Sequence, residues 1–75
     1  MTVKEHLRQL LDNRKTEEEI RTAIEPKLAS GCKLRIYVES CITKAGTSGY
    51  KQCAEIFSCD DANENLTDCG ACQGG

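Results

Sequence analysis

The side chains of this 75-residue chain that most clearly offer chemistry are its six cysteines, all of which lie from residue 32 onward. Cys69 and Cys72 are separated by two residues, a spacing at which both thiolates can reach one tetrahedral Zn²⁺. Cys53 and Cys59 would complete a four-cysteine site, with Cys41 as the other candidate. A zinc ribbon carries a second Cys-x2-Cys pair, and this sequence has none. Zinc binding by Cys69, Cys72, Cys53 and Cys59 is therefore the alternative interpretation.

Disulfide bonding is the interpretation that the sequence favours. A chain this short buries only about 60% of its unfolded surface, and its hydrophobic content is 39% with no tryptophan. Small domains of this kind are commonly stabilised by disulfides. Cys32 and Cys41 cannot pair with each other, because a strand would hold them about 30 Å apart. From the strand register argued below, we expect Cys41 to pair with Cys53.

Catalytic arrangements are not visible in the sequence. His6 is the only histidine, and no nucleophile lies near it along the chain. A nucleophile and its base are needed for covalent catalysis, and no glycine-rich phosphate-binding loop is present. We therefore expect a protein that is not an enzyme and has no cofactor of its own.

Charge and hydropathy restrict the partners. The net charge is −2 and the pI is near 5.3, which argues against binding to a nucleic-acid phosphate backbone. No apolar run is long enough for a membrane span, so we expect no membrane association. The stretch from Thr2 to Leu11 is too charged for a signal peptide. A cytoplasmic location is the expectation, with a mature secreted domain as the alternative.

The stretch from Cys32 to Thr43 alternates strictly between two faces. Its even-numbered side chains are mostly aliphatic, whereas its odd-numbered ones are mostly polar or charged. A period of two residues is typical of a strand with one buried face. This strand is therefore predicted to form the centre of the core.

Two helices are predicted before the strand. Thr2 with Glu5, and Thr16 with Glu19, form capping boxes at which helices begin. Pro26 lacks an amide hydrogen, so the second helix should end at Ile24–Glu25. The short link between the helices makes them antiparallel neighbours. Their apolar faces should pack on the strand through Leu7, Leu10, Ile20, Ile24, Leu34, Ile36 and Val38.

After the strand, residues 44–49 are typical of a turn, and Tyr50–Cys59 can be interpreted as a strand or a helix. We favour the strand, because it supplies hydrogen-bond partners to the first strand. Pairing Tyr37 with Phe57 aligns the aliphatic faces and sets Cys41 opposite Cys53. This register also places Glu39 opposite Glu55, which is unfavourable.

The predicted fold class is α+β in one small domain covering residues 1–75. Residues 2–30 form an antiparallel helix pair, residues 32–58 a two-stranded antiparallel hairpin, and residues 59–75 a cysteine-containing acidic loop and tail. Because the first strand is longer than its partner, part of its ladder stays open to another strand.

The predicted function is a small, non-enzymatic protein-binding module, such as an inhibitor or regulatory subunit. Inhibitors carried by mobile elements, including anti-CRISPR proteins, have this size and acidity. The expected partner is another protein or a second copy, bound through a sheet edge. The alternatives are a cysteine-ligated zinc-binding module and a secreted disulfide-rich signalling or defence domain.

Overall fold

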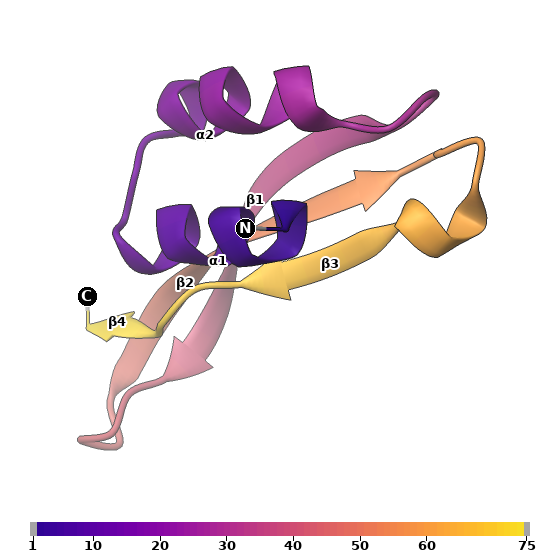
Figure 1. Cartoon of the computed structure of the whole chain (residues 1–75). Coiled ribbons are helices and arrows are strands. Elements are labelled where there is room, and N and C mark those ends of the chain that lie inside the picture. The colour runs from indigo at the N-terminus through magenta and orange to yellow at the C-terminus, as the bar shows by residue number, and fades with distance from the viewer. Residues whose placement is uncertain (1, 75) are drawn as a thin grey trace.

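Two helices lie over one face of an antiparallel sheet in the computed structural model, which describes residues 2–74 (Figure 1). The sheet order is β1-β2-β3, and β4 pairs with β2 beyond the end of β3. The predicted α+β class is confirmed, and the sheet is larger than the expected hairpin. The elements in chain order are α1 (Val3–Asp12), α2 (Glu17–Ile24), the 3-10 helix η1 (Glu25–Lys27), β1 (Lys33–Ile42), β2 (Ser48–Phe57), the 3-10 helix η2 (Ala62–Glu64), β3 (Leu66–Cys69) and β4 (Gln73–Gly74).

Both helices begin at the predicted capping boxes. The amide of Glu5 donates to the Thr2 hydroxyl at 3.1 Å, and the amide of Glu19 donates to the Thr16 hydroxyl at 3.2 Å. These bonds satisfy amides that have no partner within the helix. Helix α2 ends at Ile24, one residue before η1, which contains Pro26. The predicted helix pair and its ends are therefore confirmed.

The core lies between the helices and one half of the sheet. Leu7, Ile20 and Ile24 are buried as expected, but Leu11 is fully buried where Leu10 was expected, and Leu10 is only partly buried. The buried face of α1 is therefore rotated by one residue around the helix axis from the face that the sequence predicted. The sheet contributes Leu34, Ala54 and Ile56 to this core.

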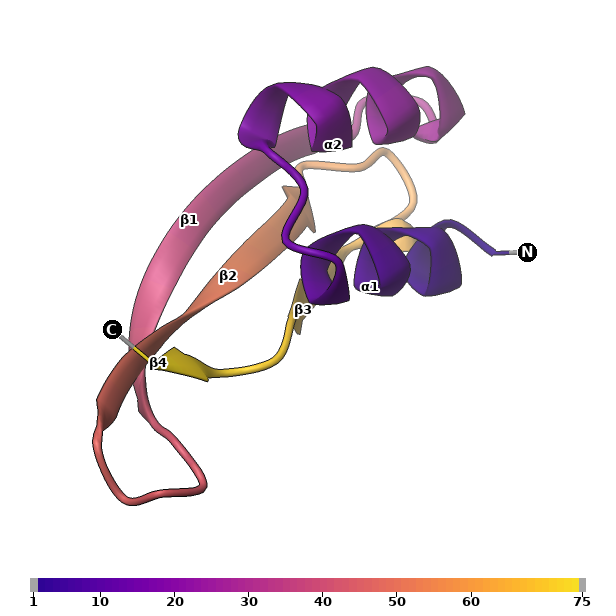
Figure 2. The same ribbon diagram turned by 90° about the vertical axis from the view of Figure 1, so that its left-hand side faces the viewer.

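Val38 was expected in the core, and that prediction is wrong because its side chain is 62% exposed. The ten and eight residues of α1 and α2 give helices of about 15 and 12 Å, whereas a ten-residue strand is about 33 Å long. The helices therefore cover only the half of the sheet that holds Leu34 and Ile56. Figure 2 shows the other half of β1 and β2 extending away from the helices.

The turn between β1 and β2 is shorter than predicted. The Thr43 amide donates to the Thr47 carbonyl at 2.9 Å, which leaves three residues in the loop, with Gly46 at a φ of +81°. A three-residue hairpin loop commonly places glycine in this left-handed conformation. The predicted turn over residues 44–49 is too long, because Ser48 and Gly49 belong to β2, and the predicted register is therefore wrong.

In the observed register Tyr37 faces Cys53, and not Phe57. The shift keeps the two faces of each strand as predicted, because it moves every partner by an even number of residues. It also replaces the unfavourable pair of glutamates. Glu39 faces Lys51 with 3.9 Å between the charged atoms, and Arg35 faces Glu55 at 3.0 Å.

Residues 59–75 were expected to be a cysteine-containing acidic loop and tail, and the structure corrects this expectation, because the described part contains two strands. Strands β3 and β4 both pair with β2, so the tail forms the second edge of the sheet. The sequence of β3 has only one large aliphatic residue, Leu66, which packs against the core. Its strand conformation depends on pairing with distant residues, which local composition does not reveal. Gly75 lies outside the described residues.

Replacing Leu11 with alanine should lower the free energy of unfolding by about 2–5 kcal/mol, because it leaves a cavity in the core. Urea unfolding of the oxidised protein measures this change. Leu10→Ala removes the same atoms from the neighbouring, partly buried position and should cost less than half as much. A Leu10→Ala effect equal to or larger than that of Leu11→Ala would mean that the helix faces the sheet differently.

Candidate functional site

Three disulfides join all six cysteines. Their pairs are Cys32–Cys59, Cys41–Cys72 and Cys53–Cys69, which are separated by 27, 31 and 16 residues along the chain. The predicted disulfide-bonded state is therefore confirmed. Disulfides persist mainly in oxidising surroundings, so the structure indicates such a setting and does not support the expected cytoplasmic location.

The Cys32–Cys59 disulfide lies at the covered end of the sheet. Cys32 comes directly before β1 and Cys59 shortly after β2, and both side chains pack against the core. The Cys59 amide donates to the Asn65 side chain at 3.1 Å, and the Asp60 amide donates to the Ser30 carbonyl at 3.0 Å. The first bond closes the acidic loop on itself, and the second attaches its start to the chain before β1.

The Cys53–Cys69 disulfide joins β2 to β3 on the face opposite the helices. The two residues face each other in the register, next to the hydrogen bond from the Gly70 amide to the Gln52 carbonyl. They therefore occupy a non-hydrogen-bonded position, where side chains of antiparallel strands come closest. Cys53 is fully buried.

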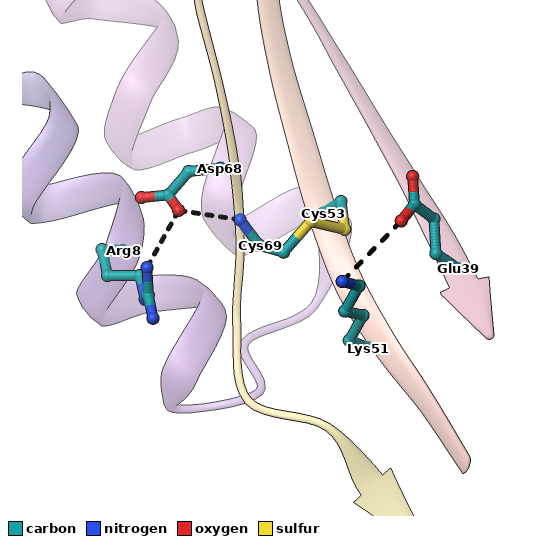
Figure 3. Close-up of a disulfide and its surroundings, with 6 residues drawn as sticks. All are labelled: Arg8, Glu39, Lys51, Cys53, Asp68 and Cys69. Atoms are coloured by element: carbon teal, nitrogen blue, oxygen red, sulfur yellow. Dashed lines mark hydrogen bonds and ion pairs between the residues drawn. A yellow bond between two sulfur atoms is a disulfide. The ribbon is translucent and has the colours of Figure 1, made fainter. Parts of the chain in front are cut away.

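Two ion pairs flank the Cys53–Cys69 disulfide, as Figure 3 shows. Arg8 of α1 binds Asp68 at 3.0 Å, and Lys51 lies 3.9 Å from Glu39. Asp68 also accepts a 2.9 Å bond from the Cys69 amide. The Arg8–Asp68 pair connects the helix to β3, so it holds the second edge of the sheet against α1.

The four residues considered as zinc ligands do not form one site. Cys53 and Cys69 share a disulfide, whereas Cys59 and Cys72 are bonded to cysteines elsewhere. Glu39 comes within 4.8 Å of the sulfur atoms of Cys53 and Cys69. Zinc binds cysteine as thiolate, and bonded sulfur atoms offer none. The arrangement in the structure therefore favours a structural role for these cysteines.

The predicted Cys41–Cys53 disulfide is wrong, because the register moves Cys41 opposite Gly49. Cys41 bonds to Cys72, in the connection between β3 and β4, with 6.1 Å between the Cα atoms. Gly49 faces Cys41 on one side and Gly74 on the other. A Cβ atom at Gly49 would collide with the Gln73 carbonyl oxygen. The missing side chain at Gly49 thus lets β4 lie close to β2 at this end.

His6 does not belong to a catalytic arrangement that the structure makes visible. Its Nδ1 atom lies 2.9 Å from the Lys27 ammonium group, at the surface between α1 and η1. The expectation that the protein is not an enzyme stays a prediction.

The outer edge of β1 offers unpaired backbone groups. The Thr43–Thr47 hydrogen bond defines the alternation along the hairpin, so odd-numbered residues of β1 bond to β2 and even-numbered ones point outward. Arg21 donates to the outward carbonyl of Leu34 at 3.1 Å. Within residues 2–74, the outward amides and carbonyls of Ile36, Val38, Ser40 and Ile42 have no partner.

Apolar side chains accompany this open edge. Val38 is 62% exposed and Ile42 69% exposed, on the helix-side face of the sheet but beyond the part that the helices cover, and Tyr50 beside them is 44% exposed. A hollow of about 200 Å³ lies over this surface, where the α1–α2 loop approaches the sheet. Its lining residues are Arg14, Lys15, Val38, Tyr50, Gln52 and Gln73. We call the sheet residues of this lining, together with Ser40 and Ile42, the open half of the sheet; Arg14 and Lys15 belong to the α1–α2 loop above it.

Comparisons with known proteins found no matching family, no curated relative and no solved structure. Among the described residues, no helix has the length and apolarity required to cross a bilayer. The sequence predicted the cysteines as the candidate site and binding through a sheet edge, but it assigned Val38 to the core and so did not identify the open half of the sheet. The signal that could have identified the open half was the length of the alternating stretch Cys32–Thr43, because the predicted helices are too short to cover a strand of that length.

The disulfide pairing can be tested by mass. The oxidised protein should weigh six hydrogens less than the reduced chain, as three disulfides require. Cys69 and Cys72 stay on one peptide after common digestions, so paired variants must separate the possibilities. Cys41→Ser/Cys72→Ser should fold without free thiols. Cys41→Ser/Cys69→Ser should leave Cys53 and Cys72 unpaired. Free thiols in the first variant and none in the second would contradict the observed connectivity.

Gly49→Ala should lower the free energy of unfolding by about 1–3 kcal/mol, because the added methyl group meets the Gln73 carbonyl and forces β4 away. Gly74→Ala is the matched control, since a Cβ there meets nothing within 4 Å. Urea unfolding measures both. Equal effects of the two substitutions would show that β4 does not lie against Gly49.

Proposed function

We propose that this chain is a non-enzymatic protein-binding domain, of the inhibitor or regulatory kind, that binds an extended segment of another protein along the edge of β1. The observation that carries the proposal is the run of outward amides and carbonyls from Ile36 to Ile42. Strand addition satisfies such groups and extends the sheet by one strand. Side chains next to the edge then provide selectivity.

The disulfides support this proposal in two ways. They suit a chain that works in an oxidising, extracytoplasmic compartment, where a secreted domain would operate. They also hold both ends of β1, through Cys32 and Cys41. A preorganised edge loses less conformational freedom on binding, so more of the contact energy contributes to affinity.

The exposed apolar side chains support the same surface. A strand bound beside β1 would place alternate side chains next to Val38 and Ile42, about 4.5–5.5 Å away between Cβ atoms. Burial of this apolar surface favours binding by roughly 25 cal/mol per Å². The hydrogen bonds then fix the position and direction of the bound segment.

Ser40→Pro tests the proposal, because it removes one outward amide. Proline is tolerated on an edge strand when its nitrogen faces solvent, so the variant should fold with three disulfides. Binding of the partner should weaken at least tenfold. Glu39→Pro is the matched control, since it removes an amide that bonds to β2 and should destabilise the fold itself.

The experiment compares immobilised wild-type and Ser40→Pro protein for capture of partners from the extracytoplasmic fraction of the source organism. A captured protein supports the proposal if the variant loses it and if amide exchange at Val38, Ser40 and Ile42 slows in the complex. Equal capture by both proteins, or slowed exchange confined to the helices, would contradict the proposal.

A further inference from the structure

We infer that the segment bound at β1 is acidic as well as apolar: it carries a carboxylate side chain toward Arg14 and Lys15, with aliphatic side chains at alternate positions. This inference rests on the proposed function and specifies the chemistry of the partner. The observation behind it is that Val38, on the open edge, shares the 200 Å³ hollow with Arg14 and Lys15.

The backbone of the two cationic residues is held in place above the sheet. The Arg14 amide donates to the Leu11 carbonyl and the Lys15 amide to the Leu10 carbonyl, each at 3.2 Å. These bonds end α1 and fix the backbone of the loop. The loop therefore carries its two cationic side chains on the rim of the hollow over the open half.

The positive charge of this loop is largely uncompensated. Among the described residues, Arg14 has no ion pair, and Lys15 reaches Glu19 only at 4.0 Å. Glu19 already accepts hydrogen bonds from Thr16 in the capping box. An exposed pair at that distance contributes little.

Among residues 2–74, no carboxylate of the sheet lines this hollow. The residues lining the hollow from the sheet are Val38, Tyr50, Gln52 and Gln73, which are apolar or neutral. Glu39 lies on the opposite face, where it faces Lys51. A ligand that enters this hollow therefore meets an apolar and amide floor and a cationic rim, which are complementary to a carboxylate on an apolar segment.

A second copy of the chain does not meet this requirement. Side chains of an added strand alternate between faces, so only every second residue lies on the helix side. In β1 itself the residues on that side are Leu34, Ile36, Val38, Ser40 and Ile42. None is acidic, so self-pairing through β1 would leave Arg14 without a counter-charge. A segment of different sequence fits better.

The test uses a library of random twelve-residue peptides displayed on phage, selected on the immobilised, oxidised wild-type chain. The expected outcome is enrichment of peptides with Asp or Glu flanked at alternate positions by aliphatic residues. A synthetic enriched peptide should bind the wild type at least tenfold more tightly than it binds Arg14→Glu. Lys4→Glu makes the same charge change on an exposed part of α1 and should leave affinity unchanged.

A charge exchange gives the decisive comparison. Replacing the acidic residue of the peptide with lysine should weaken binding to the wild type and restore binding to Arg14→Glu. Such coupling between two substitutions indicates a direct interaction. It is not expected from a general effect of net charge, which Lys4→Glu would reproduce.

The outcomes separate this inference from the proposed function. Some enriched peptides could bind the wild type and lose affinity for Ser40→Pro, which would support the proposed function. If such peptides lacked an acidic residue, or bound Arg14→Glu equally well, they would overturn the inference alone. A selection without enrichment, or with peptides insensitive to Ser40→Pro, would contradict both. Sedimentation showing a dimer with protected Val38 and Ser40 amides would overturn the inference in favour of a second copy.

Discussion

The half of the sheet that the helices leave uncovered depends on the Cys41–Cys72 disulfide. The core beneath α1 and α2 holds the other half through buried aliphatic side chains. At the open half, β1 would be attached to the rest of the fold only by its ladder with β2, and a lone hairpin is marginal in water. Bonding Cys41 to Cys72 ties the end of β1 to the connection between β3 and β4. The disulfide thus substitutes for a core that 75 residues cannot extend over the whole sheet.

The stabilisation expected from each of the three disulfides is large enough to take the place of hydrophobic packing. Loops of 16, 27 and 31 residues correspond to about 3–4 kcal/mol each in the chain-entropy estimate. The loops overlap, so these values do not add, but each is large beside the 5–15 kcal/mol stability typical of a folded domain. Cys32–Cys59 reinforces a region that is already packed, whereas Cys41–Cys72 stabilises one that has little packing of its own. Removal of the Cys41–Cys72 disulfide should therefore affect the outer edge of β1 more than the core.

The sequence predicted what is local and missed what depends on distant pairing. The Thr2 and Thr16 capping boxes and Pro26 define the helices within a few residues, and strict alternation identified β1 and its faces. The predicted register was wrong because it aligned Tyr37 with Phe57, whereas a three-residue turn sets Glu39 opposite Lys51 and Arg35 opposite Glu55. The disulfides could not be derived, since six cysteines allow 15 pairings and the right one requires the register. Strand β3 has too little hydrophobic pattern to be recognised alone.

The open half of the sheet escaped prediction for a related reason. Alternation assigned Val38 and Ile42 to the buried face, and that face is correct, but burial also requires an element long enough to cover them. The α1–α2 loop crosses above the sheet where the helices end, and so it brings Arg14 and Lys15 next to Val38. The same short helices that limit the core therefore create both the exposed apolar surface and the cationic rim beside it. A domain with longer helices would gain a larger core and lose the surface at which we propose that the partner binds.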